Sequence, residues 1–513
     1  MDTLLSRISE FIKKKDYLQA EELGWQLYKQ KKNDFNTIKN LGLILLLQGK
    51  FYGSIDLYEK AYQKNANDLD VVTNLAYLYL KIEEFQKSYD FCNKSIDMNP
   101  EAYMPFVTLL DLNLRKRDFI EAHRLAEMIL KKVDYETLVK DSLIIYLVLD
   151  AYLAAEKKTE ALKLVYYLYK KEFNSDVFYY HSGFSPETIS EQVVKAALNV
   201  TKINNYNNAV EKGKKLAPIY FGLAKYYEKK KNDTLSDENY IIGNQQIAEV
   251  QRFQPLTNQT LIKQIKKIFT SRKSSYPSVD DSGLVFIVGM PRSGTTLVES
   301  IIASANNTIS GGELRSIHEL VKFNYEEDDD ILETNDPGNV YLERIKFIRD
   351  KNKFFIDKLP GNYHNIGFIK EIFPKSKIIY IKRDPWDNAI SLFKQFYVSN
   401  IPYASSFFNL GIMYANHLEI MRFWKEEMGA DILTIEYESL VQDTTQWANT
   451  IFNYCEIPDQ YDETKREGFF ARTASKNQVT QGVYTNSIDK SFFADKKEEF
   501  LNSLENQKKY WNL

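Results

Sequence analysis

The sequence has little cysteine and little histidine. Cys92 and Cys455 are the only two cysteines, and five histidines are spread over 513 residues. Two cysteines this far apart form neither a disulfide framework nor a zinc-binding motif, and we expect both to be small buried apolar residues. No spacing of His, Cys and carboxylate residues indicates a metal site.

The chain also lacks strong charge, long apolar runs and many helix breakers. A net charge of −3 is not the basic balance of a nucleic-acid-binding protein. No apolar run reaches ~20 residues, and the opening MDTLLSRISEFIKKKD has no signal-peptide pattern. We therefore expect a soluble, cytoplasmic protein without a membrane span. With 20 Gly and 13 Pro the composition favours long helices over an all-β fold, and the length favours two to four domains.

The first part of the chain contains a repeat. An aromatic residue recurs every 34 residues, at Tyr17, Phe51, Phe85 and Phe119. A small residue follows each of them three positions later, at Ala20, Ser54, Ser88 and Ala122. This period resembles the tetratricopeptide (TPR) repeat, a pair of antiparallel helices in which the small residue permits close helix packing. Such pairs stack because one pair cannot bury its apolar face alone.

The period is clear over about residues 3–134, and helical patterns without a period continue to residue 252. A stretch rich in Ser, Pro and Asp then marks a boundary. We predict a TPR-type helical repeat domain at 1–252, a linker at 253–282 and a second domain at 283–513. The TPR resemblance implies a peptide or protein partner on the concave surface of the repeats. The sequence does not indicate the oligomeric state.

The second domain opens with an anion-binding pattern. An apolar run at 284–288 predicts a buried parallel strand, Gly289 to Thr296 a glycine-containing turn, and 297–304 a helix. Backbone amides and the helix dipole converge on such a turn, and Thr295 and Thr296 add hydroxyl donors. A Walker A loop needs Lys directly after its last Gly, but Thr295 stands there and the cation is Arg292.

The segment GMPRSGTTLVE, with this strand and helix around it, resembles the 5′-phosphosulfate loop of the sulfotransferases that use 3′-phosphoadenosine 5′-phosphosulfate (PAPS). The resemblance is to the tyrosylprotein-sulfotransferase-like branch and extends from about residue 284 to 490. It implies a three-layer α/β, P-loop-like domain with a parallel sheet after the α-helical TPR solenoid. It also implies PAPS as cosubstrate, adenosine 3′,5′-bisphosphate as product, and loop contacts from Arg292, Ser293, Gly294, Thr295 and Thr296.

The same resemblance implies catalytic residues. Glu313, within Gly311–Arg315, corresponds to the base that deprotonates the acceptor hydroxyl, and Arg315 would orient it or steady the developing charge. His318, one helical turn further, is a rival base, but we interpret it as a histidine on a helix surface. Lys358, at the end of a predicted strand, corresponds to the lysine that contacts the sulfate and the leaving phosphate oxygen.

Further residues correspond to the nucleotide site. Arg383 ends another predicted strand and Ser391 follows eight residues later, which resembles the family's 3′-phosphate site. Tyr437 corresponds to a tyrosine near the nucleotide, and Ser475 and Lys490 to contacts from a closing loop. Two anion sites favour PAPS over ATP.

The sequence therefore predicts in-line transfer of a sulfuryl group from PAPS to an acceptor hydroxyl of a protein tyrosine, a saccharide or a small molecule, with no metal. Two alternatives stay open. The first is a P-loop kinase or NTPase with Asp357 as its Walker B carboxylate. The second is a catalytically inactive TPR scaffold. The acidic run Glu326–Asp330 is interpreted as a solvated loop.

Overall fold

The computed structural model describes residues 2–203, 205–271, 276–325, 336–397, 401–466, 469–470 and 493–513. The chain divides into two compact units. The first, called the repeat unit, comprises Met1–Ala155 and Arg315–Asp350, and the second, called the sheet unit, comprises Glu156–Leu314 and Lys351–Leu513. The sequence predicts different boundaries, with domains at 1–252 and 283–513 and a linker at 253–282. That division stays a prediction.

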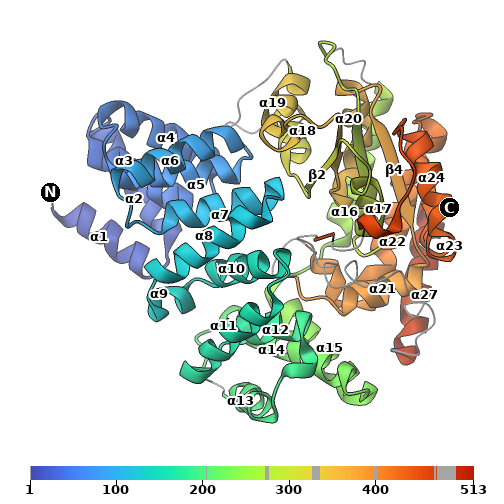
Figure 1. Cartoon of the computed structure of the whole chain (residues 1–513), viewed down its shortest axis with the longest axis horizontal. Coiled ribbons are helices and arrows are strands. Elements are labelled where there is room, and N and C mark those ends of the chain that lie inside the picture. The colour runs from blue at the N-terminus through green and yellow to red at the C-terminus, as the bar shows by residue number, and fades with distance from the viewer. Residues whose placement is uncertain are drawn as a thin grey trace. The chain divides into compact units, whose positions relative to one another are not determined.

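Paired antiparallel helices build the repeat unit, as the 34-residue period predicts (Figure 1). The periodic aromatic residues are the first residues of α2 (Tyr17–Gln30), α4 (Phe51–Lys64), α6 (Phe85–Met98) and α8 (Phe119–Lys132). These helices alternate with α1 (Asp2–Lys13), α3 (Phe35–Leu47), α5 (Leu69–Lys81) and α7 (Met104–Lys116). The TPR-like repeats are thereby confirmed.

The small residues of the period sit at the closest helix contacts. Ser54 and Ser88 are completely buried. Each hydroxyl donates to a carbonyl twelve residues earlier on the paired helix, Ser54 to Gly42 and Ser88 to Ala76, both at 2.7 Å. A larger side chain would push these helices apart and break the hydrogen bond, which explains why the period keeps a small residue here.

Two further parts complete the repeat unit. The short helix α9 (Tyr135–Lys140) precedes α10 (Ser142–Ala154), and this insertion accounts for the slipped phase of the period. Helices α18 (Ser316–Tyr325) and α19 (Pro337–Arg349) come from the later segment, and α19 packs against α6 and α7. The buried Arg344 of α19 pairs with Glu319 of α18 at 3.3 Å.

The sheet unit begins with helices, namely α11 (Lys158–Lys171), α12 (Ser175–Phe184), α13 (Glu191–Thr201), α14 (Ala209–Lys229), α15 (Asp233–Val250) and α16 (Pro255–Ser271). Helices α14 and α15 pack as a hairpin. The hydroxyl of Ser236 donates to the carbonyl of Ala224 at 3.1 Å, again twelve residues earlier. This hairpin therefore repeats the packing device of the repeat unit, although no sequence period reveals it.

A five-stranded parallel sheet forms the centre of the sheet unit. Its strands are β1 (Leu284–Gly289), β2 (Thr308–Gly312), β3 (Phe354–Asp357), β4 (Lys377–Lys382) and β5 (Leu433–Glu436). They are ordered β2-β3-β1-β4-β5, so β3 and β4 flank β1 on opposite sides. In such a sheet, ligands bind beyond the carboxyl ends of the strands where the order switches sides.

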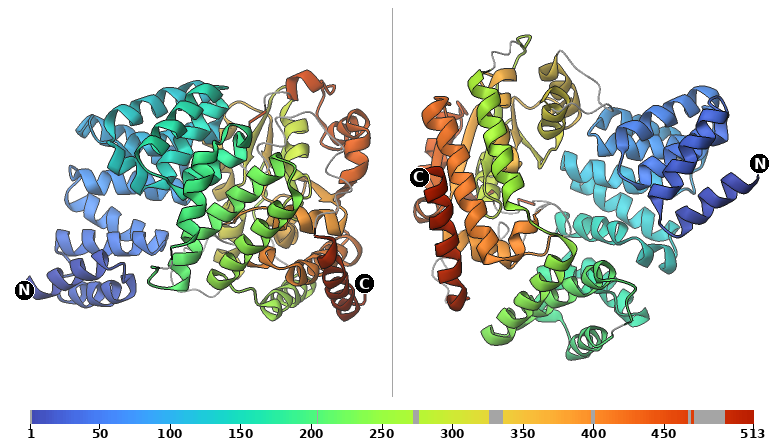
Figure 2. Two further views of the ribbon diagram at one scale, coloured as in Figure 1. Left: turned by 90° about the horizontal axis from the view of Figure 1, so that it is seen from below. Right: turned by 180° about the vertical axis from the view of Figure 1, so that it is seen from behind.

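Helices cover both faces of the sheet and make the predicted three layers. On one face, side chains such as Val285 and Ile287 pack against α17 (Thr295–Ala303), α23 (Tyr437–Gln442) and α24 (Thr444–Tyr454). On the other, Phe286 stacks on Phe373 after α20 (Ile366–Ile372), and Tyr380 meets α22 (Phe407–Arg422). The C-terminal helix α27 (Lys497–Trp511) runs beside α22 (Figure 2).

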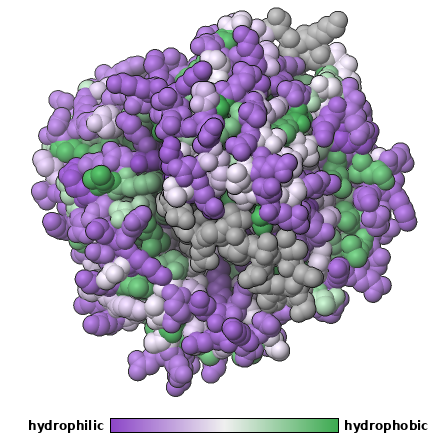
Figure 3. Space-filling model, turned by 45° about the vertical axis from the view of Figure 1, so that its right-hand side comes forward, coloured by the Kyte–Doolittle hydropathy of each residue, from purple (hydrophilic) through white to green (hydrophobic). Residues whose placement is uncertain are grey.

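The visible surface is mainly hydrophilic, with apolar side chains in small separate patches (Figure 3). Large exposed apolar residues include Leu18, Ile120 and Leu256. Scattered residues of this kind are usual on protein surfaces and do not mark a binding patch. None of the described helices combines the length and apolar character needed to cross a membrane.

Candidate functional site

The site is built from the residues that directly follow the five parallel strands. Strand β1 leads into the glycine-containing loop, β2 into Glu313, β3 into Lys358, β4 into Arg383 and β5 into Tyr437. Because the strands are parallel, their carboxyl ends lie at one edge of the sheet. The fold thus brings to one edge five segments that are up to about 150 residues apart in sequence.

The loop after β1 requires its glycines. Gly294 has φ +110°, and a Cβ there would lie 2.4 Å from the ring of Tyr437. A Cβ on Gly289 would lie 2.6 Å from the carbonyl oxygen of Ile381. Arg292 also adopts a left-handed conformation, with φ +67°. This tight turn presents the first amides of α17, which starts at Thr295, as donors for an anion.

Two arginines and a serine meet at this loop. The Arg292 Nε donates to the hydroxyl of Ser391 on α21 (Pro385–Phe393) at 3.2 Å. Arg383 is 8% exposed and donates from Nη1 to the carbonyl of Arg292 at 3.0 Å. Its guanidinium also lies 4.7 Å from the ring centroid of Tyr437. The structure therefore brings Arg292, Arg383, Ser391 and Tyr437 together beside the loop.

A buried ion pair occupies the neighbouring strand ends. Lys358 is completely buried, and its Nζ lies 2.5 Å from Oε1 of Glu313 and 3.6 Å from Oε2 of Glu299. Burial alone would lower the pKa of Lys358, but the two carboxylates outweigh it and raise the pKa above its usual value. Ser310 donates to Glu299 at 2.6 Å. Lys358 is thus a fixed cation, and Glu313, with 41% of its side chain exposed, is the carboxylate that reaches solvent.

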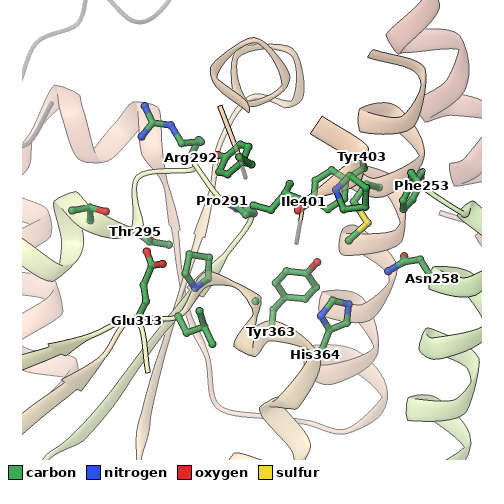
Figure 4. Close-up of a pocket in the computed structure, with 17 residues that line it drawn as sticks. Phe253, Asn258, Pro291, Arg292, Thr295, Glu313, Tyr363, His364, Ile401 and Tyr403 are labelled. Carbon is green, nitrogen blue, oxygen red and sulfur yellow. The ribbon is translucent and has the colours of Figure 1, made fainter. Parts of the chain in front are cut away.

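A cavity of about 470 Å³ opens beside these groups. Arg292, Thr295 and Glu313 line one side, and Tyr363, His364, Tyr403 and Phe253 line the opposite side (Figure 4). The cavity is therefore polar where the loop and Glu313 lie, and aromatic where an acceptor molecule could rest.

The remaining predicted residues fall into two groups. Arg315 and His318 belong to the repeat unit, whereas Glu313 belongs to the sheet unit. The backbone amide of Arg315 donates to the carboxylate of Glu83 at 2.9 Å, and His318 is exposed on α18. The role of Arg315 in orienting the base stays a prediction. Ser475, Lys490 and the acidic run Glu326–Asp330 lie outside the described residues.

Residues 285–463 match the model of the sulfotransferase family. The chain carries a sulfotransferase-family domain. The match includes β1 from its second residue, all of β2 to β5, and every predicted site residue from Arg292 to Tyr437. Among the described residues, no group of three or more His, Cys, Asp or Glu side chains is placed to hold a metal ion.

Two curated relatives share parts of the chain. An uncharacterized protein of Aquifex aeolicus (strain VF5) is 28% identical over 300 residues, which are 53% of this chain and 39% of that protein. Protein-tyrosine sulfotransferase 1 of Danio rerio is 24% identical over 193 residues, which are 35% of this chain and 54% of that protein. The chain thus spans about two fifths and about half of their lengths.

Two solved structures align with about half of the chain each. A tetratricopeptide repeat protein from Parabacteroides merdae aligns at 17% identity and a TM-score of 0.32, over 48% of this chain and 92% of its own. The sulfotransferase domain of the olefin synthase of Synechococcus PCC 7002 aligns at 14% identity and a TM-score of 0.30, over 45% of this chain and 98% of its own.

The sequence reasoning missed several residues of the sulfotransferase domain. Glu299 is one of them, although an acid within the apolar stretch TTLVESIIA is a detectable signal. Asn388 holds the loop by donating to the carbonyl of Pro291 at 3.0 Å. The aromatic side of the cavity comes from two short 3-10 helices, Pro360–Asn365 and Pro402–Ser405, and from Phe253 before α16. These segments share no motif, so the sequence gives no signal for this side of the cavity.

Proposed function

We propose that this protein transfers a sulfuryl group from PAPS to an acceptor hydroxyl. The observation that carries the proposal is the Glu313–Lys358 ion pair, which opens on a cavity shared with the glycine-containing loop. A base, a buried cation and a phosphate loop are the groups that such a transfer needs. The family of residues 285–463 supports the same reaction.

The residues of the site fit PAPS. The Oγ of Ser293 is buried and finds no hydrogen-bond partner among the described residues, which suits a phosphate oxygen as acceptor. A side chain at Gly289 would meet the carbonyl of Ile381 and one at Gly294 would meet the ring of Tyr437, so the tight turn that directs the loop amides depends on both glycines. Arg292 and the hydroxyls of Thr295 and Thr296 would hold the 5′-phosphosulfate, and Arg383 and Ser391 the 3′-phosphate.

When bound, PAPS supplies an activated sulfuryl group. Glu313 accepts the proton of the acceptor hydroxyl, and its exposed carboxylate can meet an acceptor in the cavity. Lys358 keeps its proton because two carboxylates stabilise the charged form, and it offers a fixed positive charge to developing negative charge. Tyr437 packs against Gly294 and under Arg383, which holds the loop and the arginine in place.

The acceptor is a hydroxyl of a protein tyrosine, a saccharide or a small molecule. The aromatic side of the cavity can stack against the ring of a tyrosine or of a sugar. The similarity to a protein-tyrosine sulfotransferase directs the first screen toward tyrosine peptides. For the TPR-like repeats we propose recognition of a peptide or protein, because stacked helix pairs of this type offer extended binding surfaces.

Calorimetric titration with adenosine 3′,5′-bisphosphate, and with ATP–Mg²⁺ in parallel, tests the nucleotide. We expect the bisphosphate to bind and Arg383→Ala to weaken it about 10- to 150-fold, because hydrogen bonds to charged groups are lost. Lys382→Ala is the matched control, since that side chain is 41% exposed and pairs with Glu436. Preference for ATP–Mg²⁺ would favour a kinase or NTPase. No binding of either nucleotide would favour an inactive scaffold.

A further inference from the structure

A lysine outside the family-matched segment lies against the nucleotide site. Lys225 belongs to α14, and its Nζ lies 4.1 Å from the ring centroid of Tyr179 on α12. Both helices precede residue 285, where the match to the sulfotransferase family begins. Lys225 and Tyr179 nonetheless belong to the same compact unit as the sheet.

Tyr179 connects Lys225 to the helix that carries Ser391. The hydroxyl of Tyr179 accepts a hydrogen bond from Nε2 of Gln395 at 2.6 Å, and its ring packs edge-on against Phe396 at 5.2 Å. Gln395 and Phe396 lie two and three residues after the end of α21, whose Ser391 receives the hydrogen bond from Arg292. The position of Lys225 is therefore fixed relative to Arg292 and Ser391.

The charges around Lys225 are unbalanced. Burial and the nearby Arg292 lower the pKa of Lys225 to about 7, and Glu228 opposes them only in part. Glu228 is already bound by Lys394 at 3.1 Å and by the hydroxyl of Tyr240 at 3.1 Å. No carboxylate among the described residues lies within ion-pair distance of Lys225.

Two further titratable groups near this position leave the imbalance in place. Tyr179 offers Lys225 an aromatic ring and a hydroxyl, and no carboxylate. Tyr397 interacts electrostatically with Arg292 and Tyr179, and burial raises its pKa further. Among the described residues, Lys225 therefore has a cationic neighbour, Arg292, and no acid at ion-pair distance, which is an arrangement that an anion would stabilise.

We propose that Lys225 binds a phosphate group of the nucleotide next to Arg292 and Ser391, so that the helical hairpin α14–α15 completes the nucleotide site. This inference rests on the proposed function. It adds a cation that the segment 285–463 does not contain, and it assigns the hairpin a part in binding the cosubstrate. The ligand chemistry is a phosphomonoester dianion on a nucleoside.

Proton uptake on binding gives a direct readout. At pH 8 a lysine with a pKa near 7 is only about one-tenth protonated, whereas a phosphate monoester with its second pKa near 6 is already ionised. A bound dianion would raise the pKa of Lys225, and the protein would take up about 0.9 proton per nucleotide. Lysines with ordinary pKa values are charged at pH 8 and contribute no uptake.

The experiment titrates the full chain at pH 8 with adenosine 3′,5′-bisphosphate in buffers of different ionisation enthalpy. We expect uptake of about 0.9 proton in the wild type and loss of that uptake in Lys225→Met, with binding about 10- to 150-fold weaker. Lys225→Arg should retain binding without uptake, because arginine is always charged. Lys229→Met, an exposed lysine of the same helix, should behave as the wild type.

The outcomes separate the two proposals. Binding without proton uptake in the wild type, or unchanged binding and uptake in Lys225→Met, overturns the role of Lys225 and leaves the proposed function intact. No binding of the nucleotide by the wild type overturns the proposed function and this inference with it. If Lys225→Met does not fold, the uptake of the wild type and its absence in Lys225→Arg decide the question.

Discussion

Replacing Lys358 by methionine should destabilise the sheet unit in a way that depends on pH. The substitution keeps the apolar stem but removes the charge, and it leaves the carboxyl of Glu299, 2% exposed, without its cation. An unpaired buried carboxylate escapes this cost by taking up a proton. From an ordinary pKa of about 4.3, that protonation costs about 3.7 kcal/mol at pH 7 and about 1.6 kcal/mol at pH 5.5. The value at pH 7 agrees with the 3–5 kcal/mol typical of a broken buried pair.

Urea unfolding followed by tryptophan fluorescence measures this loss. Four of the five tryptophans, Trp386, Trp424, Trp447 and Trp511, belong to the sheet unit, so the signal reports mainly on that unit. We expect the free energy of unfolding to fall by about 3–4 kcal/mol at pH 7 and by about half that at pH 5.5. Lys353→Met, an exposed lysine just before β3, should change it by less than about 0.5 kcal/mol.

A second substitution gives the decisive comparison. Glu299→Gln in the Lys358→Met background removes the unpaired charge and should recover at least half of the loss at pH 7. An equal loss at both pH values, or no recovery in the double variant, would refute the assignment of the cost to Glu299. The cavity left by the shorter methionine would then be the better explanation.

Two more predictions concern single side chains. Glu313→Gln should lower kcat for sulfuryl transfer about 10²- to 10⁴-fold, while the Kd of adenosine 3′,5′-bisphosphate changes little. Steady-state kinetics and calorimetry measure the two quantities, and an equal loss of catalysis and of nucleotide affinity would contradict the role of Glu313 as the base. His417, buried beside Tyr380, has its pKa lowered to about 3 by burial, so the unfolded state protonates first as pH falls below about 6.5. Stability should therefore fall by about 1.4 kcal/mol per pH unit from this group between pH 6.5 and 3, and urea unfolding of His417→Gln should show a shallower fall.

The repeat helices were predictable because their packing imposes a period. An aromatic residue at each helix start and a small residue at each close contact recur at a fixed distance, as in Phe51 with Ser54. The hairpin α14–α15 uses the same serine-to-carbonyl contact between Ser236 and Ala224. It escaped detection because a single hairpin has no neighbouring copy with which a period could be recognised.

The polar edge of the sheet was predictable for a different reason. Each apolar run predicts a strand, and the polar residue after the run marks the end of that strand. Because parallel strands end at one edge of the sheet, Lys358 and Arg383 are expected near the loop. The order of the strands does not follow from such runs. The pairing of Lys358 with Glu299 depends on that order and on the packing of α17, so it became visible only in the structure.

The segment that holds Glu313 explains why its neighbours could not be read from the sequence. Before Glu313, the carbonyl of Gly312 accepts a hydrogen bond from the amide of Lys358 at 2.9 Å, within the sheet unit. Two and three residues after Glu313, the amides of Arg315 and Ser316 donate hydrogen bonds to Glu83, each at 2.9 Å, within the repeat unit. The proposed base therefore stands where the chain passes from one unit to the other. A pattern of four or five letters suggests that Glu313 and Arg315 act together, but the backbone of Arg315 is held by a carboxylate 232 residues away, and no local pattern encodes that partner.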